Sequence, residues 1–151
     1  MSNPPLLNVA GEPINPNIRY VRVARRGVLG GLSAGTLTVS LVLWAVRTIL
    51  LGAPASDRPV TTGIAPDLLL FGVLGAAVLA GGLAWWRLGA IESTFRRGGL
   101  SLVAAVATVV VAIAATPIYH ALGRNGLLAL AALGAAGTIA FLRPRTDEIA
   151  A

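Results

Sequence analysis

Four long apolar runs dominate the sequence and restrict the folds open to it. They cover residues 28–51, 68–86, 100–122 and 127–142. A hydrocarbon core of about 30 Å takes about 20 helical residues to cross, and within lipid each backbone donor and acceptor must be bonded inside the protein. The runs lack the alternation of barrel strands. We therefore expect an all-α integral membrane protein, a bundle of four transmembrane helices.

The residues beside the runs predict where the helices begin and end. The second run follows Pro66 and Asp67, which suit the first turn of a helix and the positive end of its dipole. The fourth follows Asn125, a good N-cap, and stops before Pro144. Because this last run is short, its helix must stand upright or extend through Arg143 by snorkelling.

The composition agrees with a membrane protein. Hydrophobic residues make up 56% of the chain and charged residues only 12%, which does not fit a soluble domain. The formal net charge is +6 and every basic residue is an arginine, but the arginines stand beside apolar runs, so the expected partner is the lipid bilayer and not nucleic acid. The absence of cysteine excludes disulfides and thiolate metal sites.

Arginine is distributed unequally between the two sides of the predicted bundle. One side has Arg47, Arg58 and Arg124. The other has nine, namely Arg19, Arg22, Arg25, Arg26, Arg87, Arg96, Arg97, Arg143 and Arg145. By the positive-inside rule the richer side is cytoplasmic, so both termini are expected inside a prokaryotic plasma membrane. The predicted interface anchors, which prefer the headgroup level, are Trp44, Trp85, Trp86 and Arg47.

The runs divide the chain into three parts. We expect a proline-rich cytoplasmic tail over residues 1–26 with a basic juxtamembrane end, a membrane domain over 27–143, and a short tail over 144–151. In the inner loop, Glu92 and Arg96 are spaced i,i+4 with Ile91 and Phe95 on a neighbouring face. The second helix is therefore predicted to continue as an amphipathic turn along the membrane surface; a solvated loop is the alternative.

Small residues recur at four-residue intervals, a spacing that lets helix backbones approach closely. These predicted packing residues are Gly27, Gly31 and Gly35, then Gly72, Ala76, Ala80 and Ala84, then Ala104, Thr108, Ala112 and Thr116. The threonine hydroxyls are expected to bond to backbone carbonyls or across to another helix. A further series, Gly75, Gly82 and Gly89, recurs every seven residues. Packing within one bundle and packing against another subunit both explain such spacings.

Few residues suggest chemistry. The acids fall in loops, in tails or at the ends of the second run, so no carboxylate is expected in mid-membrane and no catalytic or metal site is predicted. His120, the single histidine, is the one candidate cofactor ligand, although beside Tyr119 it also fits an interfacial belt. Arg47 could snorkel or contact an anionic lipid, a partner carboxylate or Asp57.

We therefore expect no enzyme and no bound cofactor. The leading hypothesis is a non-catalytic accessory or assembly subunit of a larger prokaryotic membrane complex, packed through its small-residue faces. The alternative is a small homo-oligomeric transporter or channel with Arg47 as an anion contact, which requires a polar path through the bundle. A third option is an electron-transfer subunit that uses His120.

Overall fold

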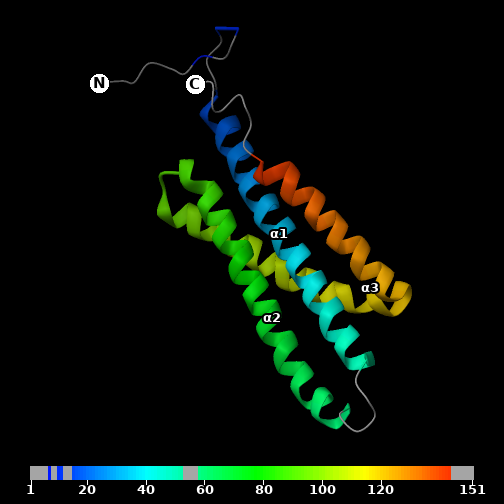
Figure 1. Ribbon diagram of the computed structural model, residues 1–151. Coiled ribbons are helices and arrows are strands. Elements are labelled where there is room, and N and C mark those ends of the chain that lie inside the picture. The colour runs from blue at the N-terminus through cyan, green and yellow to red at the C-terminus, as the bar shows by residue number, and fades with distance from the viewer. Residues whose placement is uncertain (1–6, 8–9, 12–14, 53–57, 144–151) are drawn as a thin grey trace.

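The protein is an all-α structure built around three long apolar helices. The computed structural model describes residues 7, 10–11, 15–52 and 58–143. The helices are α1 (Pro16–Gly52), α2 (Arg58–Arg87) and α3 (Thr94–Leu142), with a short 3₁₀ helix η1 (Leu88–Ala90) after α2 (Figure 1). Each long helix contains a stretch long and apolar enough to cross a membrane. The described residues thus contain three such helices and not the four predicted.

The count differs because the third and fourth predicted spans are both contained in α3. The backbone of this 49-residue element is non-helical at Gly123, where φ is 62° and ψ is −147°. We call Thr94–Leu122 the first arm and residues 124–142 the second arm. A positive φ with this ψ is accessible in practice only to glycine. The reversal therefore occurs at Gly123, two residues before the predicted N-cap Asn125.

Contacts along α1 give the direction of each neighbour. In the first arm, Thr108 lies against Gly35 and Tyr119 against Arg47, so this arm runs parallel to α1. In the second arm the order is reversed, because Leu142 lies against Gly30.

Three further contacts give the directions of the second arm and of α2. Gly134 of the second arm lies against Leu37, which confirms its antiparallel course. α2 is antiparallel as well, since Gly27 meets Leu88 and Gly72 meets Val42. The first arm also packs on α2, since a Cβ added to Gly81 would lie 3.3 Å from the Ser101 carbonyl oxygen. Figure 1 shows α2 and the second arm of α3 on either side of α1, with the first arm passing behind α1 from the side of α2. α1 is therefore the central helix.

The helices extend beyond the apolar runs that predict them. α1 begins at Pro16, well before residue 28, and is about 55 Å long for its 37 residues, longer than a hydrocarbon core of about 30 Å. α2 begins at Arg58, so Pro66 lies inside the helix and does not start it. Once nucleated, a helix propagates at little cost into polar flanking residues. Hydropathy thus located the spans but not the helix ends.

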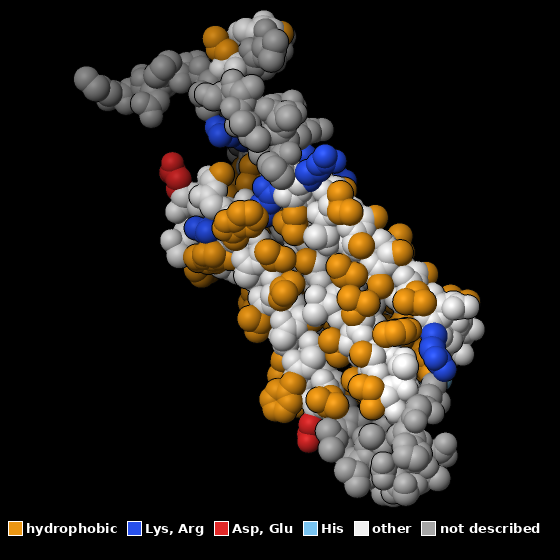
Figure 2. Space-filling model, in the orientation of Figure 1, with side chains coloured by type: hydrophobic (Ala, Val, Ile, Leu, Met, Phe, Trp, Pro, Cys, Tyr) orange, Lys and Arg blue, Asp and Glu red, His pale blue; other side chains and the backbone are white. Residues whose placement is uncertain are grey.

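The outer surface is apolar along most of its length. Exposed side chains include Phe71 and Val78 on α2 and Val110, Ile113 and Leu133 on α3. Figure 2 shows hydrophobic side chains along the visible face, with most of the visible arginines gathered at one end. Water would not tolerate so much exposed apolar area, whereas lipid does. The surface indicates contact with a bilayer, and the three candidate spans indicate a multi-pass membrane protein.

Candidate functional site at the arginine-rich end

The predicted packing residues mostly lie at contacts within the chain. A Cβ added to Gly31 would meet the carbonyl oxygen of Ala80, and one added to Gly35 would meet Thr108 and Ala80. Nearly all of the set is buried or half-buried, as listed here: Gly27, Gly31, Gly35, Gly72, Ala76, Ala80, Ala84, Ala104, Thr108 and Ala112. Thr116 is exposed. The first two stripes therefore bring α1 and α2 together, and the third turns its buried part towards α1.

The seven-residue glycine series on α2 behaves differently. Gly75 and Gly82 are exposed, and a Cβ at either would meet nothing within 4 Å. Gly89 lies beyond the helix in η1, and its Cβ would reach only Arg97, at 3.9 Å. This face of α2 is uncovered, and its two glycines leave gaps between the exposed side chains of Phe71 and Val78. Other faces of α2 are packed against α1 and the first arm of α3.

Sequence reasoning missed a third close approach, between α1 and the second arm of α3. A Cβ at Gly134 would lie 2.6 Å from the Leu37 nitrogen, and one at Gly137 would meet the Ser33 side chain. Ala131, Gly134 and Thr138 recur at three- and four-residue intervals, so the signal was present in the sequence. These residues hold the second arm against α1.

The buried polar residues among those described are three hydroxyl residues that bond within their own helices, while half-buried Arg87 has a buried Nε without a hydrogen-bond partner. Ser40, Ser101 and Thr108 are buried. Ser40 Oγ donates to the Thr36 carbonyl at 2.7 Å, Ser101 Oγ to the Arg97 carbonyl at 2.9 Å, and Thr108 Oγ1 to the Ala104 carbonyl at 2.9 Å. The predicted bond from Thr108 to a carbonyl is thus present. Each hydroxyl therefore uses its one donor within its own helix and keeps only oxygen lone pairs for other groups.

Arginines of α1, α2 and α3 lie at the end of the molecule where α2 meets α3. Arg97 Nε donates to the Trp85 carbonyl at 2.8 Å, and its guanidinium lies 4.3 Å from the Trp85 ring. Arg87 lies 5.4 Å from the Trp86 ring. These arginine-tryptophan pairs fit the headgroup level predicted for Trp85 and Trp86.

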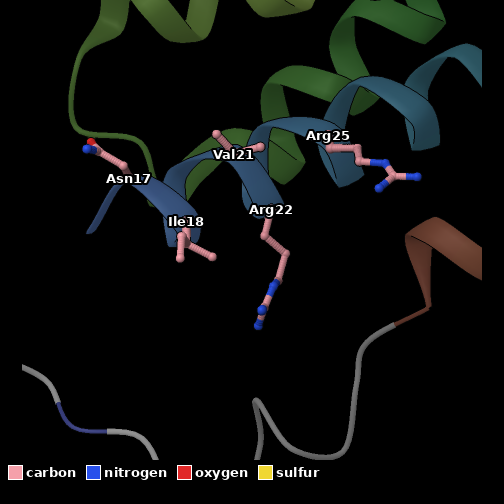
Figure 3. Close-up of a pocket in the computed structure, with 5 residues that line it drawn as sticks. All are labelled: Asn17, Ile18, Val21, Arg22 and Arg25. Atoms are coloured by element: carbon pink, nitrogen blue, oxygen red, sulfur yellow. The ribbon is translucent and has the colours of Figure 1, made fainter. Parts of the chain in front are cut away.

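The remaining described arginines of the predicted set lie near the start of α1 or at the end of α3. Arg22 and Arg25 are exposed on the first turns of α1, where Arg26 is half-buried, and Arg143 is the C-cap of α3. Arg145 lies outside the described residues. Figure 3 shows Arg22 and Arg25 projecting from α1 beside Asn17, Ile18 and Val21, around a surface hollow of about 390 Å³. α1 alone supplies its described lining, so this hollow is one helix face.

The link between α2 and α3 departs from the predicted amphipathic turn. α2 ends at Arg87, η1 follows, and Ser93 caps α3 by accepting a hydrogen bond from the Arg96 nitrogen at 3.4 Å. Glu92 precedes this cap, so it does not share a helix face with Arg96. Ile91 is 8% exposed and Phe95 92% exposed, so these two residues do not share a face either. The prediction was wrong because the cap at Ser93 starts a new helix there.

This link and α1 enclose a cleft of about 530 Å³. Its lining comes from α1 and from the segment that joins η1 to α3, namely Arg19, Tyr20, Val23, Ala90, Ile91, Glu92, Ser93 and Arg96. Arg96 lies 5.8 Å from the Tyr20 ring across the two elements. The lining of this open cleft combines two arginines, one carboxylate and a hydroxyl with apolar side chains, and it is the best candidate site in the described residues.

The opposite end has a smaller polar cluster. The Arg47 guanidinium lies 4.7 Å from the Tyr119 ring, and the His120 ring meets Tyr119 edge-on with centroids 6.1 Å apart. His120 is exposed and Trp44 is half-buried on α1. Asp57, the predicted acid for Arg47, lies outside the described residues. Within the described part, no three His, Cys, Asp or Glu side chains are grouped to hold a metal ion.

Comparisons with protein-family models, with curated proteins and with solved structures give no match for this chain.

Proposed function

We propose that this protein is a non-catalytic accessory or assembly subunit of a larger prokaryotic membrane complex. The observation that carries the proposal is the difference between the two faces of α2. Its inner face is filled by contact with α1, whereas Gly75 and Gly82 open onto empty space. In lipid, small residues favour helix association because they let backbones approach closely. The gaps at these two glycines, between exposed Phe71 and Val78, would receive side chains of a helix from a partner subunit.

The proposal includes four membrane crossings, with both arms of α3 passing through the bilayer. The antiparallel course of the arms beside α1 supports this topology. The arginine-rich end is then cytoplasmic, in the plasma membrane, by the positive-inside rule. Because the chain has no cysteine, single variants can test each position separately. Ser93→Cys and Arg143→Cys should be protected from an impermeant thiol reagent in intact cells, and Asn125→Cys should be labelled.

A transporter or channel has less support from the interior. Among the described residues, the buried polar side chains are Ser40, Ser101 and Thr108, and their hydroxyls donate to carbonyls of their own helices. Arg47, the predicted anion contact, lies against Tyr119. A path for ions or polar solutes needs a series of open polar groups across the membrane.

The test of the subunit role is co-purification after gentle detergent extraction. Native mass spectrometry of the wild-type protein should find a stoichiometric foreign membrane subunit. The double variant Gly75→Leu, Gly82→Leu should lose that subunit, because two leucine side chains would occupy the open space at these positions. The double variant Ala129→Leu, Ala136→Leu, which places two leucines seven residues apart at exposed positions of the second arm, is the control. A wild-type protein that is purified as a homogeneous monomer would contradict the proposal.

A further inference from the structure

We propose that the cleft between α1 and the start of α3 binds the headgroup of an anionic phospholipid, with Arg19 and Arg96 as the phosphate ligands. The inference requires the chain to lie in a bilayer but does not depend on a partner subunit. It rests on the charge, the lining and the position of the cleft, which are independent observations.

The residues that line the cleft have an excess of positive charge. The N-terminus of a helix has partial positive charge and is stabilised by acidic side chains, yet the first turn of α3 has no acid and contains Arg96 and Arg97. Arg19 of α1 lines the same cleft. Glu92 is the one acid among the residues that line it. Positive charge therefore exceeds negative charge in the cleft, and a bound anion would offset the excess.

The hydrogen-bond donors around the cleft differ in whether they already have a partner within the chain. Ser93 already satisfies the backbone nitrogens of Arg96 and Arg97, through its hydroxyl and its carbonyl respectively. The Arg97 side chain is held by the Trp85 carbonyl and ring. The guanidinium of Arg96, by contrast, lies 5.8 Å from the Tyr20 ring and is exposed, as is Arg19. The exposed guanidinium groups of Arg19 and Arg96 would thus bind the phosphate, because guanidinium forks match its oxygens.

The apolar part of the cleft lining favours a lipid over a free phosphate ion. Val23, Ala90 and Ile91 add apolar side chains to the lining, which a soluble anion does not need but the first methylenes of a lipid do. Tyr20, which lines the cleft, is a residue typical of the headgroup level. Glu92 would repel a second negative charge but can accept a hydrogen bond from a headgroup hydroxyl. A monoanionic headgroup with hydroxyls, such as phosphatidylglycerol, therefore fits best.

The test uses the full-length protein in a neutral detergent, titrated with short-chain phosphatidylglycerol and followed by native mass spectrometry. We expect one lipid per chain, tighter than phosphatidylcholine of the same chain length. Arg19→Gln and Arg96→Gln should each weaken binding about tenfold, the value of one charge-assisted hydrogen bond. Arg96→Lys, which keeps the charge without the fork, should fall between the wild-type protein and Arg96→Gln, and it serves if Arg96→Gln does not fold.

The matched control is Arg143→Gln. Arg143 is an exposed arginine that caps the end of α3 and does not line the cleft, so this variant should bind like the wild-type protein. Equal loss in Arg143→Gln would overturn the proposal in favour of general surface charge. Displacement of the lipid by inorganic phosphate at comparable concentration would assign a phosphate site instead. Equal binding of phosphatidylcholine would show that the arginines do not select the headgroup.

Discussion

The glycines of α1 and those of α2 differ in what surrounds them. Gly27, Gly31 and Gly35 of α1 leave so little room that an added Cβ would meet Leu88, Ala80 or Thr108. Gly75 and Gly82 of α2 have nothing within 4 Å of the same added atom. Both series are regular, so the spacing places the glycines on one side of a helix but does not indicate which element, if any, packs there. The neighbours decide whether a glycine is required for the fold or left for another molecule.

The largest expected effect is on the packed series. Gly31→Val should lower the free energy of unfolding by about 3 kcal/mol, because its Cβ would meet the Ala80 carbonyl oxygen, a backbone atom that cannot rotate away. The measurement is an unfolding titration in mixed detergent and SDS micelles. Gly75→Val, which meets open space, is the matched control. Similar losses at both positions would remove the distinction between the two series.

Gly123 is the next most sensitive position, for a conformational reason instead of a steric one. Nothing lies within 4 Å of an added Cβ there, but φ is 62°. Gly123→Val should therefore cost about 2 kcal/mol by forcing a side chain into a backbone region that only glycine adopts readily. Gly99→Val, also in open space but at a helical position of α3, should cost much less in the same titration. Equal costs would argue against the reversal at Gly123.

The open series should respond with the opposite sign. Gly82→Ala should raise the free energy of unfolding of the isolated chain by up to about 1 kcal/mol, because alanine stabilises a helix interior relative to glycine and meets no neighbour here. The same titration measures the change. A clear loss in the purified monomer would mean that Gly82 is covered within the chain.

The smallest effect is expected at Thr108, where the packed glycine Gly35 contacts a hydroxyl. Thr108→Val should lower the free energy of unfolding by about 0.6 kcal/mol, because it removes the bond from Thr108 Oγ1 to the Ala104 carbonyl. The loss is small because that carbonyl belongs to the same helix and keeps its backbone partner. Thr108→Leu should cost more, because it adds volume against Gly35. A large loss in Thr108→Val would indicate a bond between helices.

The candidate cleft was only partly foreseeable from the sequence. Arg96 and Glu92 stood out through their spacing, and the inner arginines through their distribution. Arg19 and Tyr20, however, lie in a segment assigned to the basic end of a tail, and the structure makes them part of α1. They meet Arg96 because α1 projects past the apolar run to the level of η1. Such a meeting depends on helix ends, which hydropathy locates poorly.

The sequence by itself determined the apolar spans, the concentration of arginine at one end and the tryptophans beside it, because transfer into lipid is a property of each segment on its own. Only the tertiary structure decided that α3 reverses at Gly123, that Gly134 approaches α1, and that Gly75 and Gly82 stay uncovered. These features depend on which backbones come close to one another, and a residue's own chemistry does not specify its neighbour.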